Sequence, residues 1–128
     1  MYELKIGDKT YTLSLTLGAS KRLQAKFGKP YAEVLDSFER MEVEEQEAVL
    51  YCALTETVDE KQFLTECDNY LYPGELMRAY SIMTKKAINP EKSLDEIEQE
   101  YNDLQNRTEN FRMQAQEAQI RRLVNQDA

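Results

Sequence analysis

The side chains of this chain that could do chemistry are carboxylates and two thiols, because the sequence contains no histidine. Without imidazole, the common Ser-His-Asp and Cys-His catalytic arrangements cannot form, and the commonest zinc ligand is missing. The sequence also has no CxxC pair, no Gly-rich phosphate loop and no Walker-type motif. These features predict a protein that is not an enzyme and that binds no cofactor or metal ion.

The densest group of acids is Glu42, Glu44, Glu45 and Glu47. Such a cluster could form a cation site or an acid/base pair. It surrounds the predicted start of a helix, however, and carboxylates in a first helical turn interact favourably with the positive end of the helix dipole. We also find no pair of acids on an apolar face, where loss of water could separate two pKa values. We therefore interpret the cluster as a helix-end feature.

The two cysteines, Cys52 and Cys67, are far apart in the sequence and lie on apolar helical stripes. This pattern predicts two buried free thiols in a reducing compartment, with a disulfide or redox pair as the alternative. No apolar run approaches the roughly 18 residues of a membrane span, and the N-terminus does not have the pattern of a signal sequence. We therefore expect a cytoplasmic protein that does not enter a membrane.

The charge of the chain is acidic overall but uneven. The 24 acidic and 16 basic residues give a formal net charge of −8, which disfavours a general attraction to nucleic acid or to anionic membranes. Basic residues predominate only in residues 1–30, where Lys21, Arg22, Lys26 and Lys29 gather on and just after one predicted helix. This basic patch is either a solvated helix face or a docking surface for an acidic part of another subunit or client.

The elements that carry these side chains follow from the apolar periodicity. Apolar residues at every second position, from Tyr2 to Ile6 and from Tyr11 to Leu15, predict a β-hairpin with a turn at Gly7-Asp8-Lys9. Helical stripes then predict five helices. Their expected ranges are 18–27, 31–41, 43–55, a fourth capped by Asp59 that carries Phe63, Leu64, Cys67 and Leu71, and 75–88. The predicted fold class is α+β, mainly α, in which the hairpin packs on a bundle of about five short helices in a compact head over residues 1–89, followed by a long C-terminal helix.

The remaining residues, 90–128, predict a helical arm. Ser93-Leu94-Asp95-Glu96 is a capping-box pattern, and no Gly or Pro follows it up to Val124. An apolar seam recurs at alternating spacings of three and four: Leu94, Ile97, Tyr101, Leu104, Thr108, Phe111, Ala115 and Ala118. The seam is thin, and Ile120, Leu123 and Val124 lie off its register. Such a helix needs a partner to bury its apolar face.

We predict partner-binding residues on this seam, namely Leu94, Ile97, Tyr101, Leu104 and Phe111, with the basic patch as a weaker candidate for subunit contacts. The alternatives for the seam are packing on its own head and pairing with the same helix in a second copy.

The N-terminal two thirds of the chain resembles a known family. The run from Ile6 to Ala19, then Leu23, the segment Lys26–Pro30 and Val34-Leu35, and the small acidic helices that follow are similar to the tail assembly chaperones of long-tailed bacteriophages and prophages. The resemblance implies a non-catalytic protein that self-associates in the host cytoplasm. It also implies that the protein holds the tape measure protein, recruits tail tube subunits and is absent from the mature virion.

Two other classes of function fit the same pattern. A structural tail completion or connector subunit would also be small and oligomeric, but it would be found in purified particles. A coiled-coil interaction adaptor would have a seam that dimerises by itself.

Overall fold

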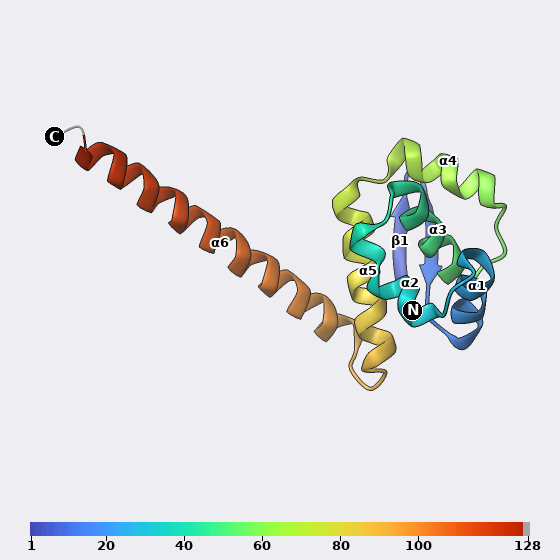
Figure 1. Ribbon diagram of the computed structural model, residues 1–128. Coiled ribbons are helices and arrows are strands. Elements are labelled where there is room, and N and C mark those ends of the chain that lie inside the picture. The colour runs from blue at the N-terminus through green and yellow to red at the C-terminus, as the bar shows by residue number, and fades with distance from the viewer. Residues whose placement is uncertain (127–128) are drawn as a thin grey trace.

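The computed structural model describes residues 1–126, and it confirms the predicted α+β fold class with mainly helical content. The last two residues of the predicted arm, 127–128, lie outside the described residues. Figure 1 shows the hairpin inside the head, with α5 along one side, α1 along the other and α4 across one end. The elements are β1 (Tyr2–Ile6), β2 (Lys9–Leu13), α1 (Leu17–Phe27), α2 (Tyr31–Asp36), η1 (Phe38–Arg40), α3 (Val43–Ala53), α4 (Glu60–Tyr70), α5 (Pro73–Ile88) and α6 (Leu94–Gln126).

The hairpin forms as its alternation predicts. Its strands are antiparallel, with Tyr2 opposite Leu13 and Ile6 opposite Lys9. The turn is therefore Gly7-Asp8 alone, and Lys9 belongs to β2 rather than to the turn. Gly7 has a φ of 61°, which suits glycine at the first position of a two-residue hairpin turn. The apolar face of the hairpin is buried in the core.

The segment after α3 joins the hairpin edge, which the sequence did not indicate. Ser14 N–H donates to the Ala53 carbonyl at 2.9 Å, and Thr55 N–H donates to the Thr12 carbonyl at 3.0 Å. A single antiparallel bridge joins Leu13 to Leu54 between them. The prediction that this helix runs to residue 55 was wrong, because its last residues turn to satisfy the open edge of β2.

The helix predicted over residues 31–41 is also two elements. α2 ends at Asp36, and η1 is a single 3₁₀ turn that follows Ser37. The Ser37 hydroxyl donates to the Val34 carbonyl at 3.0 Å, a local bond that competes with continued helix. The Gln46 amide then donates to the Phe38 carbonyl at 2.8 Å. These side-chain bonds replace the α-helical bonds that a continuous helix would make.

The other helix ends follow the predicted signals. The Thr16 side chain accepts from Ala19 N–H at the start of α1, and Gly28 ends it with a φ of 67°. Asp59 caps α4 by accepting from Gln62 N–H at 3.0 Å. Cys52 on α3 and Cys67 on α4 are buried and free, as predicted. The fifth predicted helix is α5, which begins two residues earlier than expected, at Pro73.

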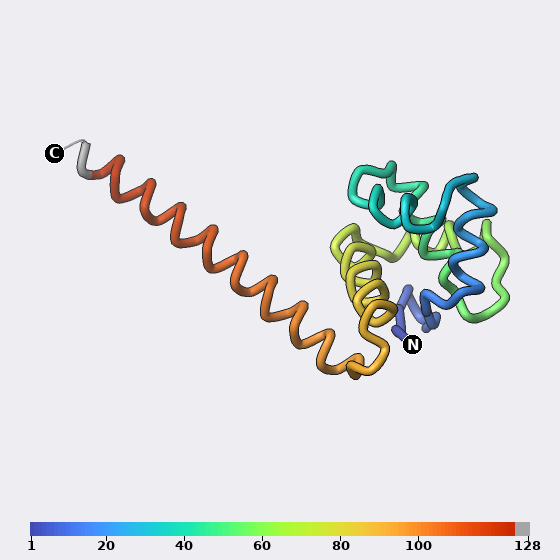
Figure 2. Tube along the Cα trace, turned by 60° about the horizontal axis from the view of Figure 1, so that its bottom comes forward, coloured from blue at the N-terminus to red at the C-terminus, as the bar shows by residue number. Residues whose placement is uncertain are grey.

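The long helix α6 begins at the predicted cap and leaves the head after about two turns. Ser93 Oγ accepts from Glu96 N–H at 3.1 Å. Ile97 is 1% exposed and belongs to the core, and Leu94 and Tyr101 are half-buried against it. Beyond Tyr101 the helix projects away from the head as a straight rod in both Figure 1 and Figure 2. We call residues 102–124 the outer arm.

This arrangement predicts opposite effects for two substitutions on the same seam. Ile97→Asp places a charge in the core and should lower the free energy of unfolding by about 3 kcal/mol or more. Phe111 is 74% exposed, so Phe111→Asp should change the free energy of unfolding by less than about 0.5 kcal/mol. Urea unfolding of both variants measures the two values. A large loss of stability in Phe111→Asp would contradict an arm that stands free of the head.

Candidate functional site

The outer arm carries six large apolar side chains that the head does not cover, Leu123 among them. On the seam, Leu104 is 52% exposed and Phe111 is 74% exposed. Further out, Met113, Ile120 and Val124 are each more than half exposed. Large apolar side chains gathered on a protein surface are a common feature of sites that contact another protein.

These side chains form two stripes on opposite sides of α6. Met113 lies nine positions after Leu104, and Ile120 lies nine positions after Phe111. At 3.6 residues per turn this is two and a half turns, so the members of each pair point in opposite directions. We call Leu104, Phe111, Ala115 and Ala118 the seam stripe, and Met113, Ile120 and Val124 the distal stripe. The arm therefore offers two separate apolar faces.

The five predicted seam residues divide between the head and the arm. Leu94, Ile97 and Tyr101 pack on the head, and only Leu104 and Phe111 are open to a partner. The distal stripe was not among the predicted partner-binding residues. Its signal was present in the sequence, because its residues are spaced by seven and four, but they lie off the register of the seam.

Arg78 of α5 holds the base of the arm. Its guanidinium lies over the Tyr101 ring, 5.3 Å from the centroid, and donates to Asn102 Oδ1 at 2.6 Å. A cation over an aromatic ring and a hydrogen bond one residue further on together fix the end of the packed section. The loop before α6 also contacts this helix, because Lys92 Nζ forms an ion pair with Glu100 Oε1 at 3.0 Å.

The predicted basic patch is partly engaged within the chain. Arg22 Nε donates to the Cys52 carbonyl at 2.8 Å, at the end of α3. Lys26 forms an ion pair with Glu60 at 2.5 Å, and that hydrogen bond raises the pKa of Lys26. Lys21 and Lys29 are exposed, and within residues 1–126 they form no ion pair. The four residues therefore do not act as one free surface.

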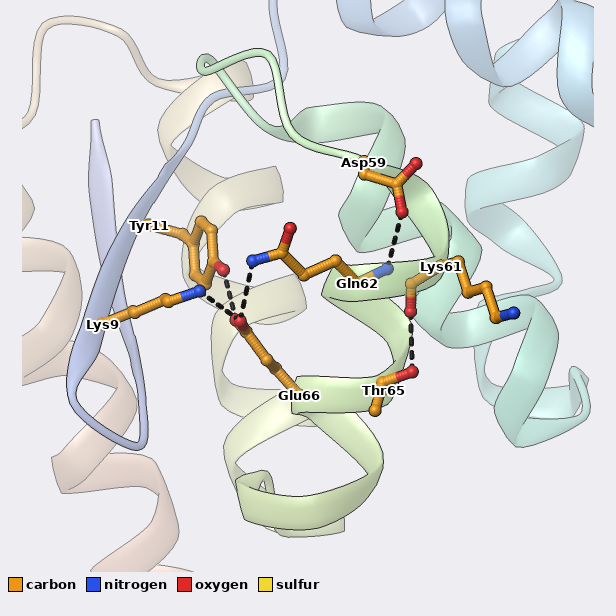
Figure 3. A network of polar contacts seen from close by, with 7 residues as sticks. All are labelled: Lys9, Tyr11, Asp59, Lys61, Gln62, Thr65 and Glu66. Atoms are coloured by element: carbon orange, nitrogen blue, oxygen red, sulfur yellow. Dashed lines mark hydrogen bonds and ion pairs between the residues drawn. The ribbon is translucent and has the colours of Figure 1, made fainter.

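A polar network joins the hairpin to α4 (Figure 3). Glu66 accepts from Lys9 Nζ at 2.5 Å, from the Tyr11 hydroxyl and from the Gln62 amide at 3.3 Å. The hydrogen bonds from Lys9 and Tyr11 lower the pKa of Glu66, and burial together with Glu66 raises the pKa of Tyr11 to about 12. No sequence signal paired Glu66 with Lys9 or Tyr11, because these two partners are more than 50 positions away from it. The network is structural, since each group is satisfied within the head.

Glu47 departs from the interpretation of the glutamate cluster as a helix-end feature. Glu44 and Glu45 lie in the first turn of α3, as the helix-dipole argument predicts. Glu47, however, is only 8% exposed. Burial, a hydrogen bond with Asp68 and repulsion from that carboxyl raise the pKa of Glu47 to about 7. Glu47 on α3 is therefore a buried acid beside an exposed one, Asp68 on α4.

The Cys67 thiol lies near Glu47 and Asp68. Burial and nearby carboxylates raise the pKa of the neighbouring Cys67 thiol to about 12, so the thiol stays protonated. Within residues 1–126, no group of three or more Cys, Asp or Glu side chains is placed to hold a metal ion. Among the same residues, no helix has both the length and the apolar character needed to cross a lipid bilayer.

The chain matches no known protein family, no curated protein and no solved structure in sequence or fold comparisons. The case for its function therefore depends on its own geometry and on the resemblance described above.

The Glu47 pKa predicts a specific pH dependence of stability. Between about pH 4.5 and 7 the folded state holds a proton on Glu47 that the unfolded state has lost, so stability falls as the pH rises through this range. Glu47→Gln should remove this part of the slope and stabilise the protein at pH 8 by about 1–3 kcal/mol, since each pKa unit corresponds to about 1.4 kcal/mol.

Urea unfolding at pH 4.5, 6 and 8 tests this prediction. Glu45→Gln is the matched control, because Glu45 is exposed on the same helix and should keep the slope of the native protein. Parallel pH profiles for Glu47→Gln and the native protein would show that Glu47 does not titrate in this way.

Proposed function

We propose that this protein is a non-catalytic phage tail assembly chaperone that binds the tape measure protein, and tail tube subunits, during tail assembly. The observation that carries the proposal is the outer arm, a projecting helix with two exposed apolar faces. An amphipathic helix of this kind binds by laying its apolar face against a complementary apolar surface. The identity of the client comes from the family resemblance.

The arm suits a client that must be held and then released. The family resemblance implies a client that is long and helical and that exposes apolar seams before the tail tube surrounds it. The apolar stripes of the outer arm are narrow, with only a few large side chains on each face. A narrow stripe buries little area for each contact, so binding to one section of the client is weak and reversible. Several arms along one client would then hold it together through combined weak contacts.

The head supports this role by fixing the arm. Ile97 in the core and the contacts of Arg78 at the base hold the first turns of α6, so the outer arm extends from an ordered start. Helix formation is costly to nucleate and easier to extend. The head therefore presents the arm as a formed helix, which lowers the ordering cost of binding a client. The same role is consistent with a protein that acts in the host cytoplasm and is not retained in the virion.

Co-expression with the tape measure protein encoded nearby tests the proposal. The native protein should keep the client soluble and should be recovered in complex with it. Phe111→Asp combined with Ile120→Asp places a charge on each apolar face and should reduce the recovered complex by about tenfold or more. Gln105→Asp combined with Gln114→Asp is the control, because it adds the same two charges at exposed positions between the two stripes.

Unchanged solubility of the client and no complex with the native protein would sink the proposal. Recovery of the protein from purified phage particles would instead favour a structural tail subunit.

A further inference from the structure

The charges on α6 are segregated along its length. Its acids near the head are Asp95, Glu96, Glu98, Glu100 and Asp103, and no basic residue lies among them. Beyond them its basic residues are Arg107, Arg112, Arg121 and Arg122, accompanied only by Glu109 and Glu117. The arm is therefore acidic at its base and basic towards its outer end.

The helix dipole explains only part of this pattern. Acids near a helix N-terminus and bases near its C-terminus are favourable, but the effect is confined to about the first and last turns. Asp103 lies in the third turn of α6, and Arg107 and Arg112 lie in its middle. Within the described residues, none of the four arginines forms an ion pair. Their charges are available to a partner.

The seam stripe lies beside these charges and continues an interface that already exists. Ile97 and Tyr101 use this side of α6 to pack on the head, and Leu104 and Phe111 extend the same side beyond it. The seam thus has a covered section followed by an open one. A helix lying along the open section would extend the packing that begins at the head.

We propose that the seam stripe of the outer arm pairs with the outer arm of a second copy of this chain, in antiparallel orientation. In a parallel pair, arginines would lie beside arginines and acids beside acids. In an antiparallel pair, the arginine-rich end of each arm lies beside the acidic base of the other. The charge pattern therefore selects both the occupant and its direction.

The pairing is weak and leaves the other face open. A stable interface commonly buries about 800 Å² on each partner, whereas the open seam offers one Leu, one Phe and two Ala from each copy. Self-association is therefore expected to depend on protein and salt concentration, because exposed charge pairs are screened by salt. Met113, Ile120 and Val124 point away from the pair. The pairing does not require the proposed client.

A charge-exchange experiment on the full chain tests the pairing. One variant carries Glu100→Lys and Asp103→Lys, and the other carries Arg121→Glu and Arg122→Glu; all four positions are exposed. In either variant alone, the base and the outer end of paired arms have the same sign. Sedimentation equilibrium at low salt should show self-association of the native chain, and each variant alone should need an approximately tenfold higher concentration or more.

An equimolar mixture of the two variants is the decisive sample. In the mixed pair, the basic base and basic end of the Lys variant lie beside the acidic end and acidic base of the Glu variant. Association should therefore return to near the native strength. Thermal unfolding of each variant confirms that the head is intact. A native chain that stays monomeric at all concentrations, or a mixture no better than its components, overturns the proposal. If only the Arg121→Glu, Arg122→Glu variant were weakened, the basic end would instead dock on an acidic part of the head. Variants no weaker than the native chain, with a mixture that associates more strongly than the native chain, would indicate a parallel pair.

Discussion

The burial of Ile97 is the contact on which the shape of this protein depends. It draws the first two turns of α6 into the core, and Arg78 fixes the helix where that packing ends. Residues 102–124 are then all exposed. A helix of 33 residues is about 50 Å long, so a contact at one end sets the direction of a surface that reaches well beyond the head. The head acts mainly as the base of this helix.

The buried carboxyl of Glu47 makes the stability of the head depend on pH. Glu47 is buried beside the exposed carboxyl of Asp68 and near the protonated Cys67 thiol, and within the described residues no group of three such side chains is placed to hold a metal ion. A raised pKa at such a position reduces stability at neutral pH. Glu47 is carried into this position because it lies on α3 next to the buried core residues Ala48, Val49 and Leu50.

Sequence patterns predicted the elements well and their junctions less well. Alternation and caps located the hairpin, α1, α4 and the start of α6, because these signals are local. The break at Ser37 is accompanied by a bond from Gln46 to the Phe38 carbonyl, and the break after Ala53 depends on the edge of β2. Both contacts form only when the chain folds back. The same limit applied to the site. The sequence showed the seam as a periodic pattern, but its division between head and arm depends on where α5 lies. Glu47 approaches Asp68 only because α3 packs on α4.

Because the two stripes lie half a turn apart, the arm has two apolar faces that can contact two neighbours at once. A helix with one apolar face can pack on one neighbour only. The proposed pairing through the seam stripe leaves the distal stripe of this helix exposed to a second neighbour. Two arms joined through their seams expose Met113, Ile120 and Val124 on opposite outer sides, at both ends of the pair. Such a unit can bridge two sections of a long chain or join successive units into a row. The length of the assembly would then be set by whatever it coats rather than by closure of a ring.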